Sequence, residues 1–184
     1  MSSTWRSASI PSKRTSFRPL TVRPVVRVPD RVLKQRAAEL GTDLDEQLVT
    51  DLLETMSVSP ACVGLAAPQI AVSKRAFAVD VTGHPKTTVC HGLVVLFDPV
   101  IVSMEGREVG REGCMSVPNL TADVARATSI VVEGITPKGE RRTLTTEGFE
   151  ARAFQHEMDH LDGMLILDRV VSLATDVFRR KTYK

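Results

Sequence analysis

Two histidines and a glutamate near the end of the chain have the types and the spacing of a metal site. The stretch Gln155–His160 reads QHEMDH. His156 and His160 are four positions apart, so on a helix both imidazoles project from the same face. Glu157, next to the first histidine, would lie near enough to act on a metal-bound water without binding the metal itself. We therefore expect a helix that holds a divalent metal beside a general base.

Two histidines leave such a site one protein ligand short, because catalytic metals usually have three. One class of peptidase with this motif has a third histidine at the position of Ile166, and another class uses a later glutamate. The isoleucine cannot bind a metal, and no glutamate follows Glu157 in the sequence. The downstream carboxylates that remain as weak candidates are Asp162, Asp168 and Asp176.

An upstream cysteine is the stronger candidate for the third ligand. The stretch Gly110–Pro118 reads GREGCMSVP, and it places Cys114 among glycines and small or polar residues. A thiolate binds divalent metals well and loses its proton when it does so. Alone, Cys114 would be read as an inert core cysteine, but the two-histidine helix needs a ligand and this residue can supply it.

A third stretch, Cys62–Gln69, reads CVGLAAPQ. Its small residues allow a backbone to approach a substrate closely. Gln69 carries an amide that could donate a hydrogen bond to a developing oxyanion. By itself this stretch indicates little, because most segments of this kind reflect only tight packing.

Taken together, these stretches resemble the peptide deformylase family, and the resemblance covers about residues 23–175. The family is marked by a GxGLAAxQ-like stretch, an EGCLS-like stretch and QHExDH, in that order. The corresponding segments of this chain are Cys62–Gln69, Glu112–Ser116 and Gln155–His160. All three segments in order form a far more specific pattern than any one of them.

Two positions depart from the family pattern. Cys62 stands where the first motif usually has glycine, and its side chain could narrow the substrate cleft or add an oxidation-prone thiol near the metal. Met115 stands where leucine is common, a substitution that roughly conserves volume. Neither change removes a chemical group that the reaction needs.

The resemblance implies a role for each matching residue. The metal ligands would be Cys114, His156 and His160. Glu157 would be the general base and then the acid, while Gln69 and the backbone N–H of Met115 would hold the oxyanion. Residues implied in substrate binding are Val63, Gly64, Gly113 and Phe149, the two glycines through their backbone and the other two as part of a methionine pocket. Glu112 and Gln155 would orient neighbouring groups.

The implied reaction is hydrolysis of the N-formyl group from the initiating methionine of a nascent polypeptide, with release of formate. A metal-bound hydroxide would attack the formyl carbon, and Glu157 would take and return the proton. One thiolate and two imidazoles suit Zn²⁺, Fe²⁺, Co²⁺ or Ni²⁺, and the resemblance implies Fe²⁺ as the native metal. The partners would be N-formylmethionyl nascent peptides, and the basic segment Phe178–Lys181 raises the hypothesis of a ribosome contact.

Two alternatives remain open at this point. The first is a zinc peptidase that uses an aspartate as third ligand and leaves Cys114 idle. The second is an inactive homologue that binds formyl-methionine chain ends or stores metal. The presence of Glu157 weighs against the second alternative, and Cys62 is the only feature in its favour.

The elements that must position these residues can be read from the pattern. A helix is expected from about Glu147 to Asp162, ended by Gly163. A second helix over residues 43–57 has leucines and a methionine recurring every four positions, and residues 29–40 look helical and end before Gly41. Strands are expected over residues 76–81, 93–104, 129–133 and 141–145, with a hairpin turn at Pro137–Gly139. The fold class is α+β, with antiparallel or mixed sheets packed around the metal-binding helix.

Composition and charge are those of one globular domain. The 184 residues are 42% hydrophobic and 25% charged, and no apolar run approaches the ~18 residues of a membrane span. Residues 1–29 hold six basic residues and no acid, which leaves 18 basic against 22 acidic residues in the rest and indicates no groove for nucleic acid. Three cysteines without a repeated spacing favour a reducing compartment.

We expect residues 1–22 to be a flexible basic extension and residues 23–184 to be a single domain. The extension is rich in serine and arginine, so it could be a targeting segment. A bacterial-type cytoplasmic location is expected, and a mitochondrion or plastid is the alternative if residues 1–22 are a transit peptide.

Overall fold

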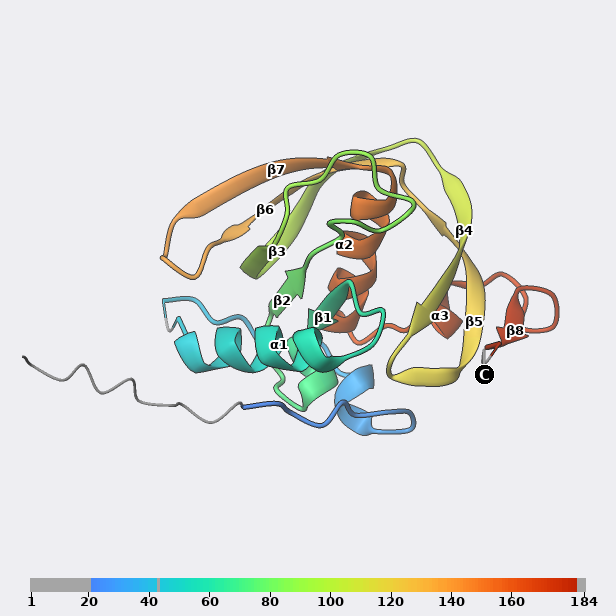
Figure 1. Ribbon diagram of the computed structural model, residues 1–184, viewed down its shortest axis with the longest axis horizontal. Coiled ribbons are helices and arrows are strands. Elements are labelled where there is room, and N and C mark those ends of the chain that lie inside the picture. The colour runs from blue at the N-terminus through green and yellow to red at the C-terminus, as the bar shows by residue number, and fades with distance from the viewer. Residues whose placement is uncertain (1–20, 43, 182–184) are drawn as a thin grey trace, which may run out of the picture.

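Two antiparallel sheets enclose one central helix, α2, in the computed structural model (Figure 1). The structure describes residues 21–42 and 44–181. The five-stranded sheet has the order β1-β2-β3-β6-β7, and the three-stranded sheet has the order β4-β5-β8. Every pairing between these strands is antiparallel. The predicted α+β class, with sheets around the helix of the HExxH motif, is confirmed.

The elements follow one another along the chain in the order of their numbers. The strands are β1 (Gly64–Ala66), β2 (Ala76–Val79), β3 (Val94–Glu105), β4 (Glu108–Cys114), β5 (Val117–Arg126), β6 (Ser129–Ile135), β7 (Arg141–Glu147) and β8 (Val177–Arg179). The helices are η1 (Arg31–Lys34), α1 (Glu46–Val58), η2 (Ala67–Ile70), α2 (Gly148–Leu161) and α3 (Ile166–Arg169). Within the described residues, no helix combines the length and apolar character needed to cross a membrane.

Helix α2 is buried along nearly its whole length, with 11 of its 14 residues in the interior. It ends where Gly163 was expected to end it. The N–H of Gly163 donates to the carbonyl of His160, and the N–H of Met164 donates to the carbonyl of Asp159. This paired closure is a Schellman motif, which needs the left-handed backbone of Gly163 at φ 72°. The last turn of the helix, which carries His160, is therefore fixed by backbone hydrogen bonds.

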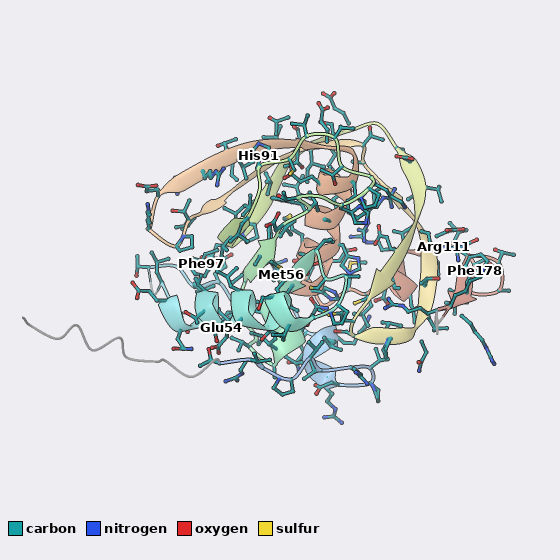
Figure 2. The ribbon with its side chains drawn as sticks, viewed as in Figure 1. Glu54, Met56, His91, Phe97, Arg111 and Phe178 are labelled. Carbon is teal, nitrogen blue, oxygen red and sulfur yellow. The ribbon has the colours of Figure 1, made fainter. Side chains whose placement is uncertain are left out.

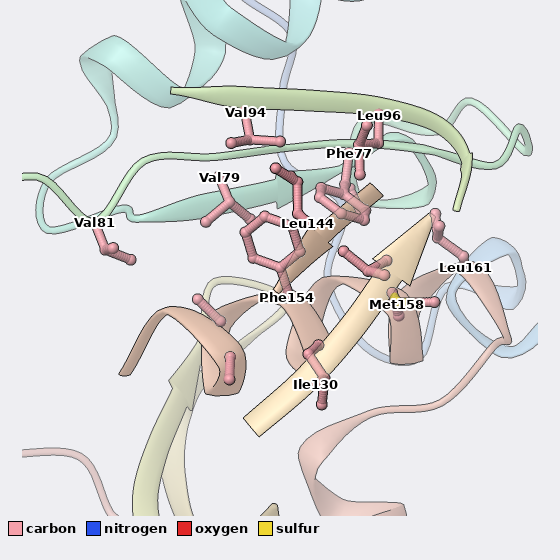
Figure 3. Close-up of a cluster of buried hydrophobic side chains, with 14 residues drawn as sticks. Phe77, Val79, Val81, Val94, Leu96, Ile130, Leu144, Phe154, Met158 and Leu161 are labelled. Carbon is pink, nitrogen blue, oxygen red and sulfur yellow. The ribbon is translucent and has the colours of Figure 1, made fainter. Parts of the chain in front are cut away.

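The main hydrophobic core lies between α2 and the five-stranded sheet, and Figure 3 shows it in close-up. Phe154 of α2 and Phe77 of β2 meet edge to face, with ring centroids 5.3 Å apart. Met158 and Leu161 extend the same apolar side of the helix toward its C-terminal end. The apolar side of α2 thus packs against the five-stranded sheet, and its polar side faces the three-stranded sheet.

Helix α1 covers a second cluster of hydrophobic side chains, to which β1 contributes Leu65 and the segment before η1 contributes Val25. It begins after Asp45, whose carboxylate accepts a hydrogen bond from Leu48 N at 3.0 Å. The first described residue lies against this helix. Thr21 N and Oγ1 donate to the Glu54 carboxylate, and Figure 2 labels Glu54 on α1. Residues 1–20 of the predicted extension lie outside the described residues.

One expectation about secondary structure was wrong, and one hairpin was missed. Of the helical stretch expected over residues 29–40, only η1 is helical, because the amides that follow bond to distant parts of the chain. Ala37 N donates to the Leu161 carbonyl, and Leu40 N donates to the Asp98 carboxylate. The hairpin of β4 and β5 was not expected at all, although it carries Cys114.

We predict that Phe154→Ala lowers the free energy of unfolding by about 3–5 kcal/mol, because a fully buried ring leaves a cavity against Phe77. Urea denaturation measures this loss. Val171→Ala is the control, since Val171 is 92% exposed and its truncation should change stability by less than about 0.5 kcal/mol. Equal effects of the two substitutions would contradict this account of the core.

Candidate metal centre

Three side chains that the sequence suggested as ligands converge at the polar side of α2. One ligand atom each from Cys114, His156 and His160 lies within 4.8 Å of the other two. Cys114 Sγ is 3.3 Å from His160 Nε2, and the two imidazole rings are 5.1 Å apart at a steep angle of 78°. The end of β4 supplies the thiol and successive turns of α2 supply the imidazoles.

These residues fit a divalent metal. His156 Nδ1 bonds to the Glu112 carboxylate at 2.9 Å, so its Nε2 is left to bind a metal. The buried Oε2 of Glu157 has no hydrogen-bond partner among the described residues. A buried carboxylate oxygen is costly to leave unpaired, and a water held by a metal would pair with it. The sulfur and nitrogen donors suit Zn²⁺, Fe²⁺, Co²⁺ and Ni²⁺ alike.

The electrostatics of the centre favour the thiolate form of Cys114. Burial alone would raise the pKa of this thiol, but the adjacent His160 and His156 outweigh burial and hold its pKa well below the usual value. The pKa of His156 is displaced in the opposite direction: burial opposes its protonation, and contacts with Cys114 and Glu112 raise it above the usual value. A thiolate is the form in which cysteine binds metals.

The Glu157 carboxyl is buried beside this group, directly against the backbone of β1. Burial raises the pKa of Glu157 to about 7, with the charges of Cys114 and Glu112 adding to the rise and the two histidines opposing it. An added Cβ on Gly64 would lie 2.5 Å from Glu157 Oε1 and 2.9 Å from its Cδ. Only glycine at this position leaves room for the carboxyl.

A buried network of charges lies behind His156, and sequence reasoning found only part of it. Glu112 accepts hydrogen bonds from Arg126 Nε at 2.9 Å and Arg152 Nη1 at 2.9 Å, in addition to its contact with His156. Arg126 Nη1 also donates to Asp159 Oδ2 at 2.6 Å. Glu112 was expected to orient a neighbouring group, and His156 is the ring that it contacts; this role stays a prediction. Asp159 is the aspartate of the QHExDH pattern, but no role was assigned to it, and no sequence signal marked the two arginines, because they find their partners only through tertiary packing.

Gln69 lies next to the sulfur of the centre. Its Oε1 accepts a hydrogen bond from Ala66 N at 3.0 Å, which fixes the amide plane. Its Nε2 then points toward Cys114 Sγ at 3.6 Å and Ser116 Oγ at 3.2 Å. The donor end of the amide is thus directed into the centre and its acceptor end is already in use.

A cavity of about 430 Å³ opens onto the centre. The site residues predicted from sequence that line it are Val63, Gly64, Gln69, Glu112, Gly113, Cys114, Met115, Phe149, His156 and Glu157. Phe149 forms one wall, stacked on the His84 ring at 3.9 Å between centroids. Sequence reasoning had no signal for His84, which comes from the loop between β2 and β3.

Cys62 also lines this cavity, at the position where glycine is usual in the family pattern. Its Sγ donates to the Gly64 carbonyl at 3.1 Å. Burial, followed by the charge of Glu157, raises the pKa of the Cys62 thiol to about 12. The thiol therefore stays protonated at neutral pH, the form least prone to oxidation.

Some predicted or candidate residues lie away from the centre. Gln155 bonds to the backbone of Ala127 and Ala151, so it ties α2 to the β5–β6 turn instead of contacting a ligand. The aspartates considered as alternative ligands are engaged elsewhere: Asp162 with Arg75, Asp168 with Lys34 and Asp176 with the backbone of Ser172.

An enclosed helix with two histidines, completed by a cysteine from a neighbouring strand, places the chain among metal-dependent hydrolases of α+β fold. The profile of the polypeptide deformylase family matches residues 22–176. This chain belongs to that family, and its expected enzyme class, peptide deformylase, is confirmed.

Close relatives and solved structures agree with this assignment. The peptide deformylase of Xylella fastidiosa (strain M12) is 40% identical over 166 residues, which cover 88% of this chain and 94% of the relative. That of Desulforudis audaxviator (strain MP104C) is 42% identical over 166 residues, covering 88% and 99%. A Met-Ala-Ser-bound class I type b peptide deformylase from Acinetobacter baumannii superimposes with a TM-score of 0.74 at 34% identity, covering 81% of this chain and 98% of that one.

We predict that Gly64→Ala lowers the free energy of unfolding by about 1–3 kcal/mol, because its Cβ would overlap the buried Glu157 carboxyl. In a Glu157→Ala background the same change should cost much less, since the space is then free. Thermal unfolding of the four proteins completes the cycle. A cost that is the same in both backgrounds would show that another contact requires the glycine.

We further predict that Cys114→Ala abolishes stoichiometric metal binding, since it leaves only two imidazole ligands. Elemental analysis after reconstitution and desalting measures the bound metal. Cys90→Ala is the matched control, because Cys90 contacts Thr82 in a loop outside the centre. Full metal occupancy in Cys114→Ala would show that a residue other than Cys114 is the third ligand.

Proposed function

We propose that this chain removes the N-formyl group from the initiating methionine of nascent polypeptides and releases formate. One observation carries the proposal: a cluster of Cys114, His156 and His160 lies at a cavity beside a buried carboxyl, Glu157, whose pKa is raised to about 7. Membership of the polypeptide deformylase family supports the same reaction.

The proposed metal ligands are Cys114 Sγ and one ring nitrogen each from His156 and His160. When bound, the metal would lower the pKa of a coordinated water and polarise the formyl oxygen. We propose Fe²⁺ as the native ion on the strength of the family resemblance, with Zn²⁺, Ni²⁺ and Co²⁺ as substitutes that the same donors accept.

Glu157 is proposed to move the proton. As a carboxylate it accepts a proton from the attacking water through Oε2, the oxygen without a partner among the described residues. It then returns the proton to the leaving amine of methionine. A carboxyl with a pKa of about 7 is close to ideal for both steps at neutral pH, because either protonation state is then readily reached.

The oxyanion that forms on the formyl group needs donors. Gln69 is suited to this role because Ala66 N occupies its Oε1 and leaves its Nε2 directed into the centre. The backbone N–H of Met115 is the second proposed donor. A donor of this kind typically contributes ~3 kcal/mol to the transition state.

The substrate chain is proposed to lie between two sheet edges. Gly64 belongs to β1, an edge strand of the larger sheet, and Gly113 belongs to β4, an edge strand of the smaller one. An extended peptide can pair with such edges through backbone hydrogen bonds. Val63, Phe149 and Met115 would then surround the methionine side chain. A formyl group, with only hydrogen beyond its carbonyl carbon, fits where an internal peptide bond would not.

Supporting roles follow from the contacts. Glu112 is proposed to orient His156 through Nδ1, and Gln155 to hold α2 against the β5–β6 turn. We propose residues 23–184 as the catalytic domain and residues 1–22 as its extension. A ribosome contact through Phe178–Lys181, and the choice between bacterial cytoplasm and organelle, stay predictions.

The test is release of formate from a formyl-methionyl tripeptide by protein purified without oxygen and reloaded with Fe²⁺ or Ni²⁺. We expect rapid release by the wild type and a loss of about 10²–10⁴-fold in kcat for Glu157→Ala, the usual contribution of a general base. Metal content, measured in parallel, separates loss of the base from loss of the metal. Absence of release from folded, metal-replete wild type would overturn the proposal and favour a protein that only binds formyl-methionine ends.

A further inference from the structure

Two cations at the rim of the cavity have no acidic partner among the residues that the structure describes. The charged residues that line the cavity are Lys86, Arg111, Glu112, Arg152, Glu157 and Arg180. Both carboxylates are buried, and Glu112 already binds two arginines. Arg111 is paired with Asp123 at 2.7 Å, and Arg152 with Glu112. Neither Lys86 nor Arg180 forms an ion pair with any described residue.

Arg180 lies directly over the backbone of the β4 edge. An added Cβ on Gly113 would overlap Arg180 Nη2, and this Nη2 donates to the Cys114 carbonyl at 3.3 Å. The guanidinium therefore covers the stretch of backbone where the substrate chain is proposed to pair. Its remaining N–H groups have no acceptor among the described residues, so they are available to a bound peptide.

The strand β8 holds Arg180 in this place. Its residues pair with β5, from Leu120↔Arg179 to Ala122↔Val177, and Arg180 N donates to the Asn119 carbonyl at 2.9 Å. Arg111 also stacks on the Phe178 ring with its Cζ 3.4 Å from the centroid, and Figure 2 shows the two side chains together. The family profile ends at residue 176, so β8 and Arg180 lie beyond the matched region.

Lys86 lies at the wall formed by Phe149. Its Nζ is 6.0 Å from the centroid of the Phe149 ring, on the loop that also brings His84 onto that ring. A peptide that places methionine against Phe149 and its backbone along Gly113 would carry its next side chains past these two cations. Exposed carboxylates of a substrate would meet attraction at the rim, and lysine or arginine side chains would meet repulsion.

We propose that Arg180 and Lys86 select formyl-methionyl peptides that have an acidic side chain in the two residues after methionine. This inference rests on the proposed deformylation. The two cations are specificity-determining residues that act on the substrate chain, and the chemistry at the metal centre does not require them.

The test compares kcat/KM of the metal-loaded enzyme for amidated formyl-Met-Glu-Ser, formyl-Met-Gln-Ser and formyl-Met-Lys-Ser. A second series places the variable residue third: formyl-Met-Ser-Glu, formyl-Met-Ser-Gln and formyl-Met-Ser-Lys, also amidated. Amidation removes the terminal carboxylate as a competing charge. We expect Glu to exceed Gln by about threefold and Lys by about tenfold, with both ratios falling at high salt, as is usual for exposed charge pairs.

Arg180→Gln should reduce the Glu-to-Lys ratio of kcat/KM by about threefold. Lys86→Gln should act in the same direction. Arg179→Gln is the matched control: it removes the same charge one residue away, outside the cavity lining, and should leave the ratio unchanged.

Equal kcat/KM of the wild type for the Glu, Gln and Lys peptides in both series would overturn the inference while leaving the deformylase proposal intact. A uniform rise for every peptide in Arg180→Gln would also overturn it, since Arg180 would then be an obstruction over Gly113. If Arg179→Gln lowered the Glu-to-Lys ratio as much as Arg180→Gln does, the selectivity would come from the net charge of the protein and not from Arg180, and the inference would be overturned. Formate release from none of the peptides would instead remove the proposed function itself.

Discussion

One buried carboxylate, that of Glu112, joins the parts of the molecule on which the metal centre depends. It lies on β4, two residues before Cys114, and it binds Arg126 at the end of β5 and both Arg152 and His156 on α2. A carboxylate in the interior is tolerable only when its charge is compensated. Burial disfavours ionisation here, but His156 and Arg126 outweigh burial and hold the pKa of Glu112 well below its usual value. Because leaving this charge unpaired would be costly, β4 and α2 must pack so that Glu112 lies against Arg152 and His156.

The orientation of the first imidazole follows from this constraint. Because Nδ1 of His156 bonds to Glu112, Nε2 is the nitrogen that faces Cys114 and the cavity. The network continues through Arg126 to Asp159 and from there to Arg169 at the end of α3. A helix with polar residues on one side can therefore be buried on that side as well, since its charges find partners from three other elements.

Features that depend on local sequence were predictable, whereas those created by tertiary contact were not. Helix α2 and its end at Gly163 follow from spacing and from one left-handed residue. The β4–β5 hairpin escaped notice because Glu108–Cys114 contains two glycines and alternating charges, a pattern without strand periodicity. The segment after η1 is extended because its amides bond to Leu161 and Asp98, partners more than 50 residues away.

The same distinction holds for the site. The cluster of Cys114, His156 and His160 could be predicted because few residue types bind metals and two of the three share a helix. Arg126 could not be found, since its partners Glu112 and Asp159 are 14 and 33 residues distant and neither separation has meaning outside the fold. Arg180 belongs to the same category, 66 residues from the carbonyl that it contacts.

The placement of two of the four edge strands, β1 and β4, has a consequence for aggregation. Edge strands expose unpaired N–H and C=O groups, which invite pairing with another chain and aggregation. Here β1 and β4 turn those edges toward a cavity of about 430 Å³ that is bordered by α2, so a sheet from a second molecule has no room to align with them. A single extended chain end can still enter. The backbone groups of β1 and β4 are thereby kept from pairing with another sheet, and under the proposed function they pair with a single peptide terminus instead.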